Sequence, residues 1–460
     1  MQEFISLIKE QGITPEIIQK MIEAHKVDHD RMIRQYDRYK ADVVPIMMRE
    51  AAEYEDFETG RAKRIDNKVN NQLNNSFDSE IIDTKVGYMF GHPISYNTDE
   101  QEALEDVVAE FGIRNNVEDK DSEWGKKAAI CGYGARLAYI DKEAVERIAN
   151  INPWETIILS DIDITEPLYA LRYYTTKVGD KTIYKAEFYD ESHVRYFVSD
   201  NNGGSYTVKE EKIHLFDYCP LFGLPNNEEM KGDAEKVLAL IDAYDRTLSD
   251  ASNEIEQYRL AYLILKGVGM DEETTEELKK SGIFELFGEH DDVKYLTKDI
   301  NDTMIENHLN RLEENILRFA KSVNFTDGTF GTSVTGVALR YKLMSLENKC
   351  ITMERKMSAA LRYQFKVLCS SWAKRGKCAD EDYLKVFFSF KRNIPVDLLE
   401  QANMTSVLKG NVSEETRLSL LSFVDDVKYE LEKMEKDALL YENDLEPLVE
   451  GVDEDGSAGD

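Results

Sequence analysis

The stretch from Gly232 to Gly267 constrains the fold more than any other, because its apolar residues recur in alternating steps of four and three. This spacing places them on one narrow seam of an α-helix over roughly three and a half heptads. A helix of about 26 residues is roughly 39 Å long, which exceeds what most globular domains need. The seam residues are Val237, Ile241, Tyr244, Leu248, Ala251, Ile255, Tyr258 and Tyr262.

A second helix with the same spacing follows after an insert of about 35 residues. Two such helices predict an antiparallel hairpin, and the pattern alone favours a hairpin within an ordinary helical core. The seam of the second helix consists of Ile305, Leu309, Leu312, Ile316, Phe319 and Val323.

The length and composition indicate a folded, soluble chain of about three domains, since 460 residues with 42% hydrophobic content can bury several cores. No run of 18 apolar residues occurs, and the N-terminus lacks the apolar region of a signal peptide. We therefore expect a protein that enters no membrane and stays in the cytoplasm where it is made. The five cysteines include no CxxC pair, which argues against a zinc ribbon or a disulfide framework.

The charge of the chain is strongly negative, because 89 acidic residues against 57 basic ones give a formal net charge of −32. Such a surface repels the phosphate backbone and argues against a tight, sequence-reading nucleic-acid binder. The same charge suits a surface past which DNA slides without sticking. Solubility alone explains acidity in most proteins, so the charge is compatible with sliding but does not imply it.

The periodicity along the chain predicts an α+β fold that is mainly helical. The first hundred residues have helical patterns, whereas residues from about 128 to 218 alternate with a period of two and predict an antiparallel β region. A small α/β insert at 270–296 separates the two seam helices. After these helices we expect a glycine-punctuated polar loop at 324–334, a long helix at about 335–372, a strand at 383–390 and a helical region from 395 onward, with Ser413 as an N-cap.

Motifs for catalysis or metal binding are weak in this sequence. Gly132 and Gly134 begin a GxGxxG pattern, but Leu137 occupies the third glycine position, so a hairpin explains the pair better than a nucleotide site does. No P-loop motif occurs, and His25 and His29 do not form an HExxH helix. We expect no catalytic residue, no cofactor and no bound metal.

Two other classes of function are compatible with the sequence. Asp161 and Asp163 lie close together, as in a metal-dependent nuclease, although the further ligands of a two-metal site are missing from the sequence. The seam helices also suit a coiled-coil scaffold or adaptor protein that binds a partner helix.

Five segments carry a likeness to a known family: Asn70–Ile94, Leu221–Val237, Leu240–Asp250, Thr335–Lys342 and Gly410–Asp426. Taken in order, they resemble the portal proteins of tailed double-stranded DNA bacteriophages, in particular the siphophage family common in Gram-positive hosts. Any one segment is weakly specific, whereas five in the same order are strongly specific. The likeness covers roughly residues 60–435, and Thr335 stands where the family usually has serine.

The resemblance implies a ring, usually of twelve identical subunits, at one vertex of the capsid. In that family the terminase motor packages DNA through the ring, DNA later leaves through it, and the ring joins head to tail and nucleates procapsid assembly. The implied partners are the terminase large subunit, scaffolding and major capsid proteins, head-to-tail adaptors and double-stranded DNA passing non-specifically. The implied location is the virion, after assembly in the host cytoplasm, and no enzymatic activity is implied.

The resemblance also implies an assignment of the chain to parts of a portal subunit. These parts are a wing (1–231), a first stem helix (232–266), a clip (267–299), a second stem helix (300–323), a tunnel loop (324–334), a long helix and strand that return to the wing (335–393), a helical crown (394–445) and an acidic tail expected to be disordered (446–460).

Candidate contact residues follow from this assignment. The tunnel loop has no lysine or arginine, so it is expected to face DNA without pinning it through phosphate pairing. Polar residues opposite the first seam, Asp250, Glu254 and Gln257, are candidates for subunit or channel contacts. The DNA-facing candidates are Thr326, Asp327, Thr329, Phe330 and Thr332, and the clip candidates for motor or adaptor contacts are Glu272, Glu273, Glu276, Phe284, Phe287 and Tyr295.

Overall fold

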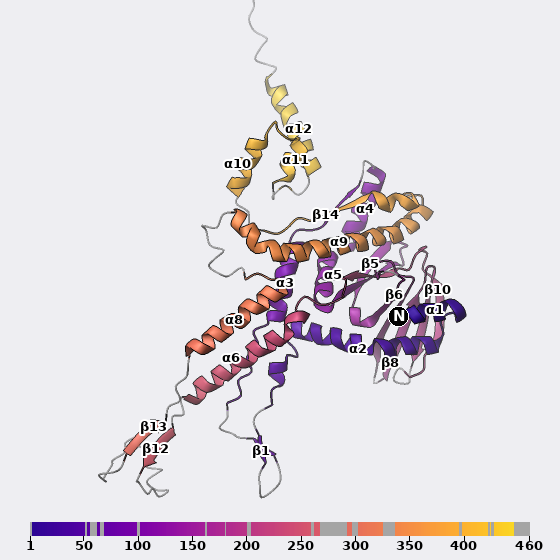
Figure 1. Cartoon of the computed structure of the whole chain (residues 1–460). Helices are drawn as coiled ribbons and strands as arrows, with labels where there is room; N and C mark the ends of the chain where they lie inside the picture. Colours follow the sequence, from indigo (N-terminus) through magenta and orange to yellow (C-terminus); the bar gives the residue numbers. More distant parts are fainter. Residues whose placement is uncertain are drawn as a thin grey trace, which may run out of the picture. The chain divides into compact units, whose positions relative to one another are not determined.

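The computed structural model describes residues 2–445 with gaps at 51–52, 56–61, 65–68, 99–101, 162, 180, 200–203, 259–261, 267–291, 297–301, 325–335, 395–397, 422–423 and 425–426. The chain divides into two compact units, of which the first ends at Arg392 and the second begins at Asn393. Figure 1 shows the elements of both units along the chain.

The first unit contains a five-stranded antiparallel sheet with the strand order β10-β9-β8-β7-β6. Two N-terminal helices, α1 (Gln2–Gln11) and α2 (Pro15–Tyr39), cover one face of this sheet, where Ile18, Met21 and Phe188 are buried together. The alternating pattern that predicted a β region is therefore confirmed. The strands are β6 (Thr156–Leu159), β7 (Tyr169–Val178), β8 (Lys181–Tyr189), β9 (His193–Ser199) and β10 (Thr207–Ile213).

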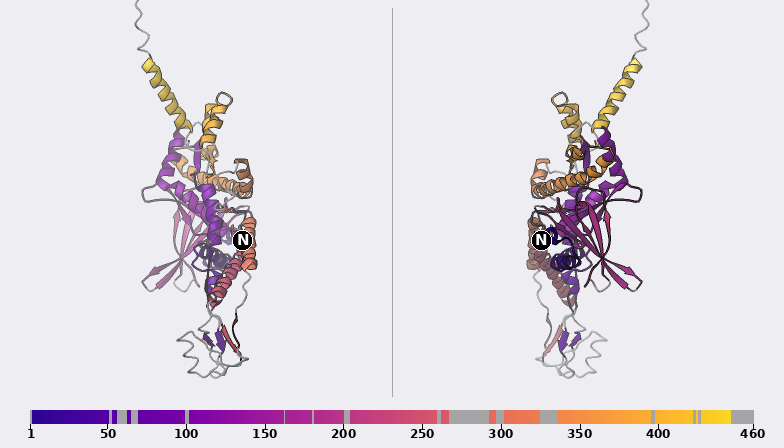
Figure 2. Two further views of the ribbon diagram at one scale, coloured as in Figure 1. Left: turned by 90° about the vertical axis from the view of Figure 1, so that its left-hand side faces the viewer. Right: turned by 90° about the vertical axis from the view of Figure 1, so that its right-hand side faces the viewer.

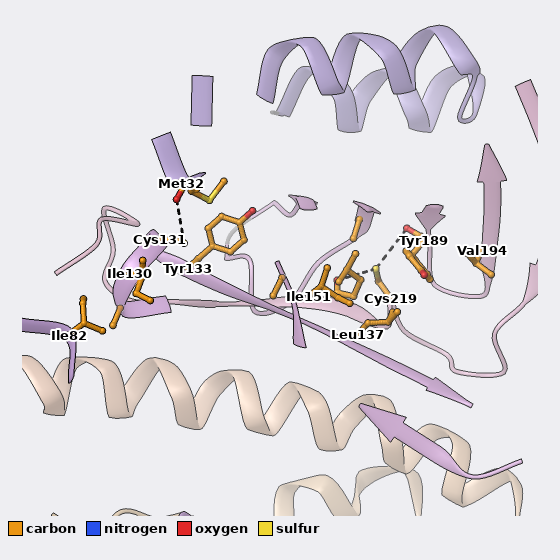
Figure 3. Close-up of a cluster of buried hydrophobic side chains, with 14 residues drawn as sticks. Met32, Ile82, Ile130, Cys131, Tyr133, Leu137, Ile151, Tyr189, Val194 and Cys219 are labelled. Atoms are coloured by element: carbon orange, nitrogen blue, oxygen red, sulfur yellow. Dashed lines mark hydrogen bonds between the residues drawn. The ribbon is translucent and has the colours of Figure 1, made fainter. Parts of the chain in front are cut away.

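A three-stranded antiparallel sheet forms the centre of the same unit, with the order β11-β4-β5. Figure 3 shows part of its core, in which Cys131 and Cys219 point into the buried cluster. Burial raises the pKa of both thiols to about 12, so they stay protonated and act as packing residues. The strands are β4 (Tyr133–Ile140), β5 (Glu146–Ile151) and β11 (Leu221–Pro225).

The glycines that began the weak nucleotide-site pattern have a structural role at the junction between α5 (Val117–Cys131) and β4. Gly132 ends α5 with a φ of 95°, and a Cβ atom there would lie 2.1 Å from the carbonyl oxygen of Met230. A Cβ atom on Gly134 would lie 2.7 Å from the ring of Trp124. The expectation of a hairpin is wrong, because the pair permits a tight helix-to-strand turn instead.

The long helix predicted from residue 335 is present as α9 (Gly336–Lys374), which buries Met353, Leu361 and Trp372. The strand expected at 383–390 is shorter, because the 3-10 helix η5 (Asp380–Lys385) occupies its first half. The remaining elements of this unit are α3 (Phe77–Phe90), α4 (Glu102–Asn115), η1 (Pro45–Met48), η2 (Pro153–Glu155), β14 (Val386–Ser389) paired with β3 (Ser95–Thr98), and β1 (Glu53–Glu55) paired with β2 (Ala62–Arg64).

The two seam helices are present as α6 (Leu238–Tyr258) and α8 (Asp302–Ala320), which lie side by side (Figures 1 and 2). The 3-10 helix η3 (Glu235–Val237) precedes α6. The predicted extension of the first helix to residue 266 is wrong, since the chain from Tyr262 forms a strand, β12 (Tyr262–Lys266), that pairs antiparallel with β13 (Asp292–Leu296). This non-local pairing outweighs the helical spacing at Tyr262.

The second unit contains three helices in its described part: α10 (Leu398–Leu408), α11 (Glu414–Ser419) and α12 (Val427–Leu445). The predicted N-cap is confirmed, because the Ser413 hydroxyl accepts a hydrogen bond of 3.2 Å from the Thr416 N–H. Leu418, Leu421 and Val424 form its small core. No helix within the described ranges of either unit is long and apolar enough to cross a bilayer.

His25 gives the first unit a testable pH dependence. The residue is buried on α2, and its Nδ1 lies 2.8 Å from the hydroxyl of Tyr173 on β7. Burial lowers the pKa of His25 from 6.5 to about 4, while Asp28 opposes and His29 and Arg31 reinforce this shift. Between these two pKa values the unfolded chain binds a proton that the folded chain does not bind. Stability is therefore lost as the pH falls from about 6.5 to about 4, by at most roughly 3 kcal/mol.

Replacing His25 with phenylalanine removes this proton linkage but keeps an aromatic ring in the site. The difference in unfolding free energy between the protein and H25F should change across this pH window and be constant above pH 7. Urea denaturation followed by circular dichroism at several pH values measures it. A difference that stays constant down to pH 4 would show that His25 is not buried in its neutral form.

Candidate functional site

The helix pair α6–α8 is the candidate functional site, and its apolar seam is buried at one end only. Val237, Ile241 and Ile316 form a core cluster with Ile81 of α3, and Leu312 is also buried. Tyr244, Leu248, Ile305 and Leu309 are half-buried, while Ile255 and Phe319 are exposed and the side chain of Tyr258 lies outside the described residues. The seam is therefore fully buried near the start of α6 and the end of α8, and its other described residues are half-buried or exposed.

A polar stripe replaces the apolar seam as the buried surface of the second half of α6. Asp245, Ser249 and Asn253 are spaced four residues apart, so they lie on one face of the helix, and all three are buried. Their side chains accept hydrogen bonds from the backbone N–H groups of Asn75 (3.1 Å), Leu73 (3.0 Å) and Asn71 (2.7 Å), respectively.

The spacing of these contacts explains why they fit together. Four residues of α-helix advance about 6 Å, and two residues of extended chain advance about 6.6 Å. The segment 71–75 therefore lies antiparallel to α6, with every second N–H satisfied by a helix side chain. A coiled-coil seam at these positions would leave those N–H groups without partners, which is why the helix carries polar residues here.

Asp245 is the charged residue of the stripe, and its carboxylate is only partly hydrogen-bonded. One of its oxygens accepts both the backbone and the side-chain N–H of Asn75, while the other oxygen is buried and has no partner within the described residues. Burial raises the pKa of Asp245, and the hydrogen bonds from Asn75 only partly oppose this effect. Asp250, a candidate for subunit or channel contacts, forms a 2.6 Å salt bridge with Arg49 of the same chain.

A substitution at the centre of the stripe tests its role. Ser249→Ala removes the acceptor of the Leu73 N–H, and is expected to lower the unfolding free energy by about 1–2 kcal/mol. Amide hydrogen exchange at residues 71–75 should accelerate by about tenfold or more, because that segment loses its central hydrogen bond. Thr247→Ala serves as the control, because Thr247 lies on the opposite side of α6 and its hydroxyl donates to the carbonyl of Ala243 in the same helix. Equal exchange rates in both variants would contradict the anchoring role.

A buried ionic cluster joins the root of the helix pair to the rest of the first unit. Asp233, just before η3, lies 2.9 Å from the ammonium of Lys85 on α3 and 3.4 Å from that of Lys349 on α9. Lys85 also donates to Asn226, and Lys349 donates to the carbonyl of Ala320 at the end of α8. Lysines from α3 and α9 thus meet at one carboxylate, and Lys349 links this group to the end of α8.

The electrostatics of this cluster depend on complete pairing. Burial by itself would raise the pKa of Asp233, but Lys85, Lys349 and Asn226 together lower it below its ordinary value. Burial lowers the pKa of Lys349, against the opposing effect of Asp233. A second salt-bridge group also ties α6 to the rest of the unit, in which Arg38 of α2 binds Asp78 of α3 at 3.0 Å and Asp242 of α6 at 2.8 Å.

Most of the contact residues inferred from the family resemblance lie outside the described residues. This applies to the tunnel-loop candidates Thr326, Asp327, Thr329, Phe330 and Thr332, and to Glu272, Glu273, Glu276, Phe284 and Phe287 of the clip. Tyr295 is located in β13, where its backbone pairs with that of Leu263.

The nuclease alternative receives no support from the described residues. Asp161 approaches Lys9 at 3.9 Å and Asp163 approaches Lys356 at 3.7 Å, so the two carboxylates have different cationic partners. No group of acidic, histidine or cysteine side chains suited to a metal ion occurs in the described part of the chain.

The structure also brings together residues that the sequence analysis did not single out, namely Asp233, Asp245, Ser249 and Asn253. The polar stripe could have been noticed as a four-residue repeat of short polar residues within an otherwise heptad-spaced helix. The pairing of Asp233 with lysines from α3 and α9 could not be predicted, because these residues lie far apart in the sequence and form no local motif.

Comparison with known proteins identifies the family. A family model described as "Phage portal protein, SPP1 Gp6-like" matches residues 18–439. The portal protein of Bacillus phage SPP1 is 27% identical over 417 residues, covering 85% of this chain and 81% of that protein. The portal protein of Clostridium phage phiCD119 is 24% identical over 390 residues, covering 80% of this chain and 84% of that protein. The resemblance inferred from five sequence segments is thus confirmed, and this chain belongs to the SPP1 Gp6-like phage portal proteins.

Proposed function

We propose that twelve copies of this chain form the portal ring of a phage head, with α6 and α8 as the stem around the DNA channel. Portal proteins of this family are ring-forming structural components of the virion capsid through which the genome passes. The number of subunits and the position of each segment in the ring are the parts that this proposal adds.

The observation that carries the proposal is the set of large apolar side chains that a single copy leaves exposed on the helix pair. Ile255 of α6 is 60% exposed, and Met304 and Phe319 of α8 are 65% and 57% exposed. Tyr341 and Met344, in the first turns of α9, are exposed as well. A closed ring covers such residues on every copy at once, because each subunit uses the same two surfaces.

The segments on either side of the helix pair supply the remaining parts of the proposal. Residues 324–334 form the tunnel loop that faces DNA, and the absence of lysine and arginine there lets DNA pass without phosphate pairing. Residues 267–299, between the helices, form the clip that contacts the terminase large subunit and later the head-to-tail adaptors. Residues 394–445 form the crown, and scaffolding and major capsid proteins contact the ring during assembly in the host cytoplasm.

A pair of charge insertions tests the stem assignment. Ile255→Glu combined with Phe319→Glu places a carboxylate on each helix at positions exposed in one copy, so the folded subunit should keep its far-ultraviolet circular dichroism. In the ring these carboxylates become buried without partners, which is costly, so the assembled fraction should fall at least tenfold. Ile113→Glu on α4, an exposed apolar residue away from the helix pair, is the control. Rings of normal yield from the double variant would exclude α6 and α8 from the subunit interface.

A further inference from the structure

A pocket of about 430 Å³ lies where the end of α2 meets η1 and the first turn of α6. Figure 1 shows α2 approaching the upper end of α6 at this place. Its volume is in the range of roughly 300–1,000 Å³ that is typical of ligand-binding pockets. The walls combine aliphatic surface from Val43, Pro45, Met48 and Leu238 with polar groups from α2.

The mouth of the pocket carries an apolar patch. Met48 is 69% exposed, and Val43 and Met47 are about half exposed. All three belong to the short connection that contains η1 (Pro45–Met48). Methionine side chains adapt to the shape of an apolar partner, so this surface suits an inserted side chain better than it suits water.

Gln35 provides a polar anchor inside the pocket. It is only 9% exposed, yet neither its Nε2 nor its Oε1 has a hydrogen-bond partner in the described structure. The carboxamide lies near enough to Glu235 to help lower the pKa of that carboxyl, although burial opposes this and the Lys231 ammonium contributes more. The amide donor thus interacts with Glu235 without reaching hydrogen-bond distance, and the amide oxygen has no partner among the described residues. Such a carboxamide can still pair with a peptide group, which offers one N–H and one C=O.

Among the described residues that line the pocket, Arg34 is the cation without a salt bridge. Arg31 binds Glu235 at 3.2 Å, Arg38 binds Asp242 at 2.8 Å, and Asp37 binds Lys40 at 3.1 Å. Arg34 is exposed and forms no salt bridge in the described residues. Its charge helps to lower the pKa of Asp30, although the hydrogen bond from His29 has the larger effect. An occupant with a carboxylate next to its apolar group would pair with Arg34.

We propose that this pocket receives a peptide segment from a neighbouring copy of this chain. The backbone of the segment pairs with Gln35, an apolar side chain fills the space between Val43, Met48 and Leu238, and an acidic residue faces Arg34. The inference rests on the proposed ring, because a ring places a second copy against every subunit. Two features favour a second copy as occupant: the chain supplies acidic residues in large excess, and α6, which forms one wall, continues into the exposed apolar surface assigned to the subunit contact.

Site-specific photo-crosslinking tests this inference directly. Benzoylphenylalanine at Met48, in the purified full-length ring, should give crosslinked dimers of this chain on irradiation, with the crosslinked peptide identified by mass spectrometry. The matched control carries the same group at Val27, which is 79% exposed on the same helix as Arg34 but does not line the pocket. Rings that give no dimer from position 48, or equal dimer yields from both positions, would overturn the inference.

Two substitutions add a measurement of affinity. Arg34→Glu should raise the protein concentration needed for half-maximal ring assembly by about tenfold, and Gln35→Leu should raise it by a similar factor, since each removes one charged or bidentate contact. Lys20→Glu on α2 has the same charge change outside the pocket and should leave assembly within twofold. Intact rings with unchanged assembly in R34E and Q35L would overturn the pocket assignment while leaving the ring itself standing. Failure of the unmodified chain to form rings would instead overturn the proposed function.

Discussion

Asp233→Ala is expected to lower the unfolding free energy by about 3–5 kcal/mol, which is the usual effect of breaking a buried salt bridge from one side. The carboxylate is the shared partner of Lys85 and Lys349, and both lysines are held in the interior by α3 and α9. Without Asp233, two ammonium groups would face each other with no anion between them. The variant should also lose the fixed geometry at the root of α6, since Asp233 lies two residues before η3.

The measurement is urea denaturation of the protein and the variant at one protein concentration, because ring assembly makes apparent stability concentration-dependent. Glu228→Ala is the matched control, since Glu228 also pairs with a lysine of α9, Lys356, at 2.7 Å but is exposed to solvent. An exposed pair contributes about 0–1 kcal/mol. A loss in D233A no larger than that in E228A would show that the buried cluster does not hold the helix pair in place.

Arg136→Leu should destabilise the first unit by a similar amount, about 3–5 kcal/mol. The guanidinium is fully buried between β4, α5 and α9, where it donates to Asp121 at 2.7 Å and to Gln364 at 2.8 Å. It also stacks 3.9 Å above the ring of Trp124 and donates to the carbonyl of Lys120. Leucine fills part of the space but leaves the carboxylate of Asp121 buried without its cation.

Arg114→Leu provides the comparison for this prediction, because Arg114 forms an exposed salt bridge with Glu110 one turn away on α4. Its loss should change stability by less than about 1 kcal/mol. Differential scanning calorimetry at one scan rate should show a clearly lower unfolding temperature for R136L alone. If R136L and R114L unfold at the same temperature, the contacts of Arg136 do not stabilise the packing of β4 against α5 and α9.

The helical spacing along the chain predicted where the helix pair lies but not where its first helix ends. Val237, Ile241 and Ile316 are buried as the seam required. Tyr262 also fits the seam, yet it belongs to β12, because its backbone partner, Leu296, lies in a strand formed after a long insert. A local pattern contains no information about such a partner, so the position at which helix gives way to strand could not be predicted.

The polar stripe on α6 shows the same limit at the candidate site. Ser249 and Asn253 resemble solvent-facing residues in the sequence, and the amide-rich run 70–75 resembles a loop. The side chains on α6 bind the backbone of the run 70–75, so the role of either segment can be recognised only when the two segments lie side by side. The family, in contrast, could be recognised from the sequence, because five segments that resemble it occur in the family's order along the chain. The residues proposed for the clip and the tunnel loop remain predictions.

The mass and shape of the purified assembly test the central claim most directly. Twelve chains of 52.9 kDa would give a particle of about 635 kDa. Light scattering coupled to size exclusion should show a single species near this mass, and negative-stain images should show rings with a central hole. A stable monomer or dimer at micromolar concentration, without rings in the images, would contradict the account.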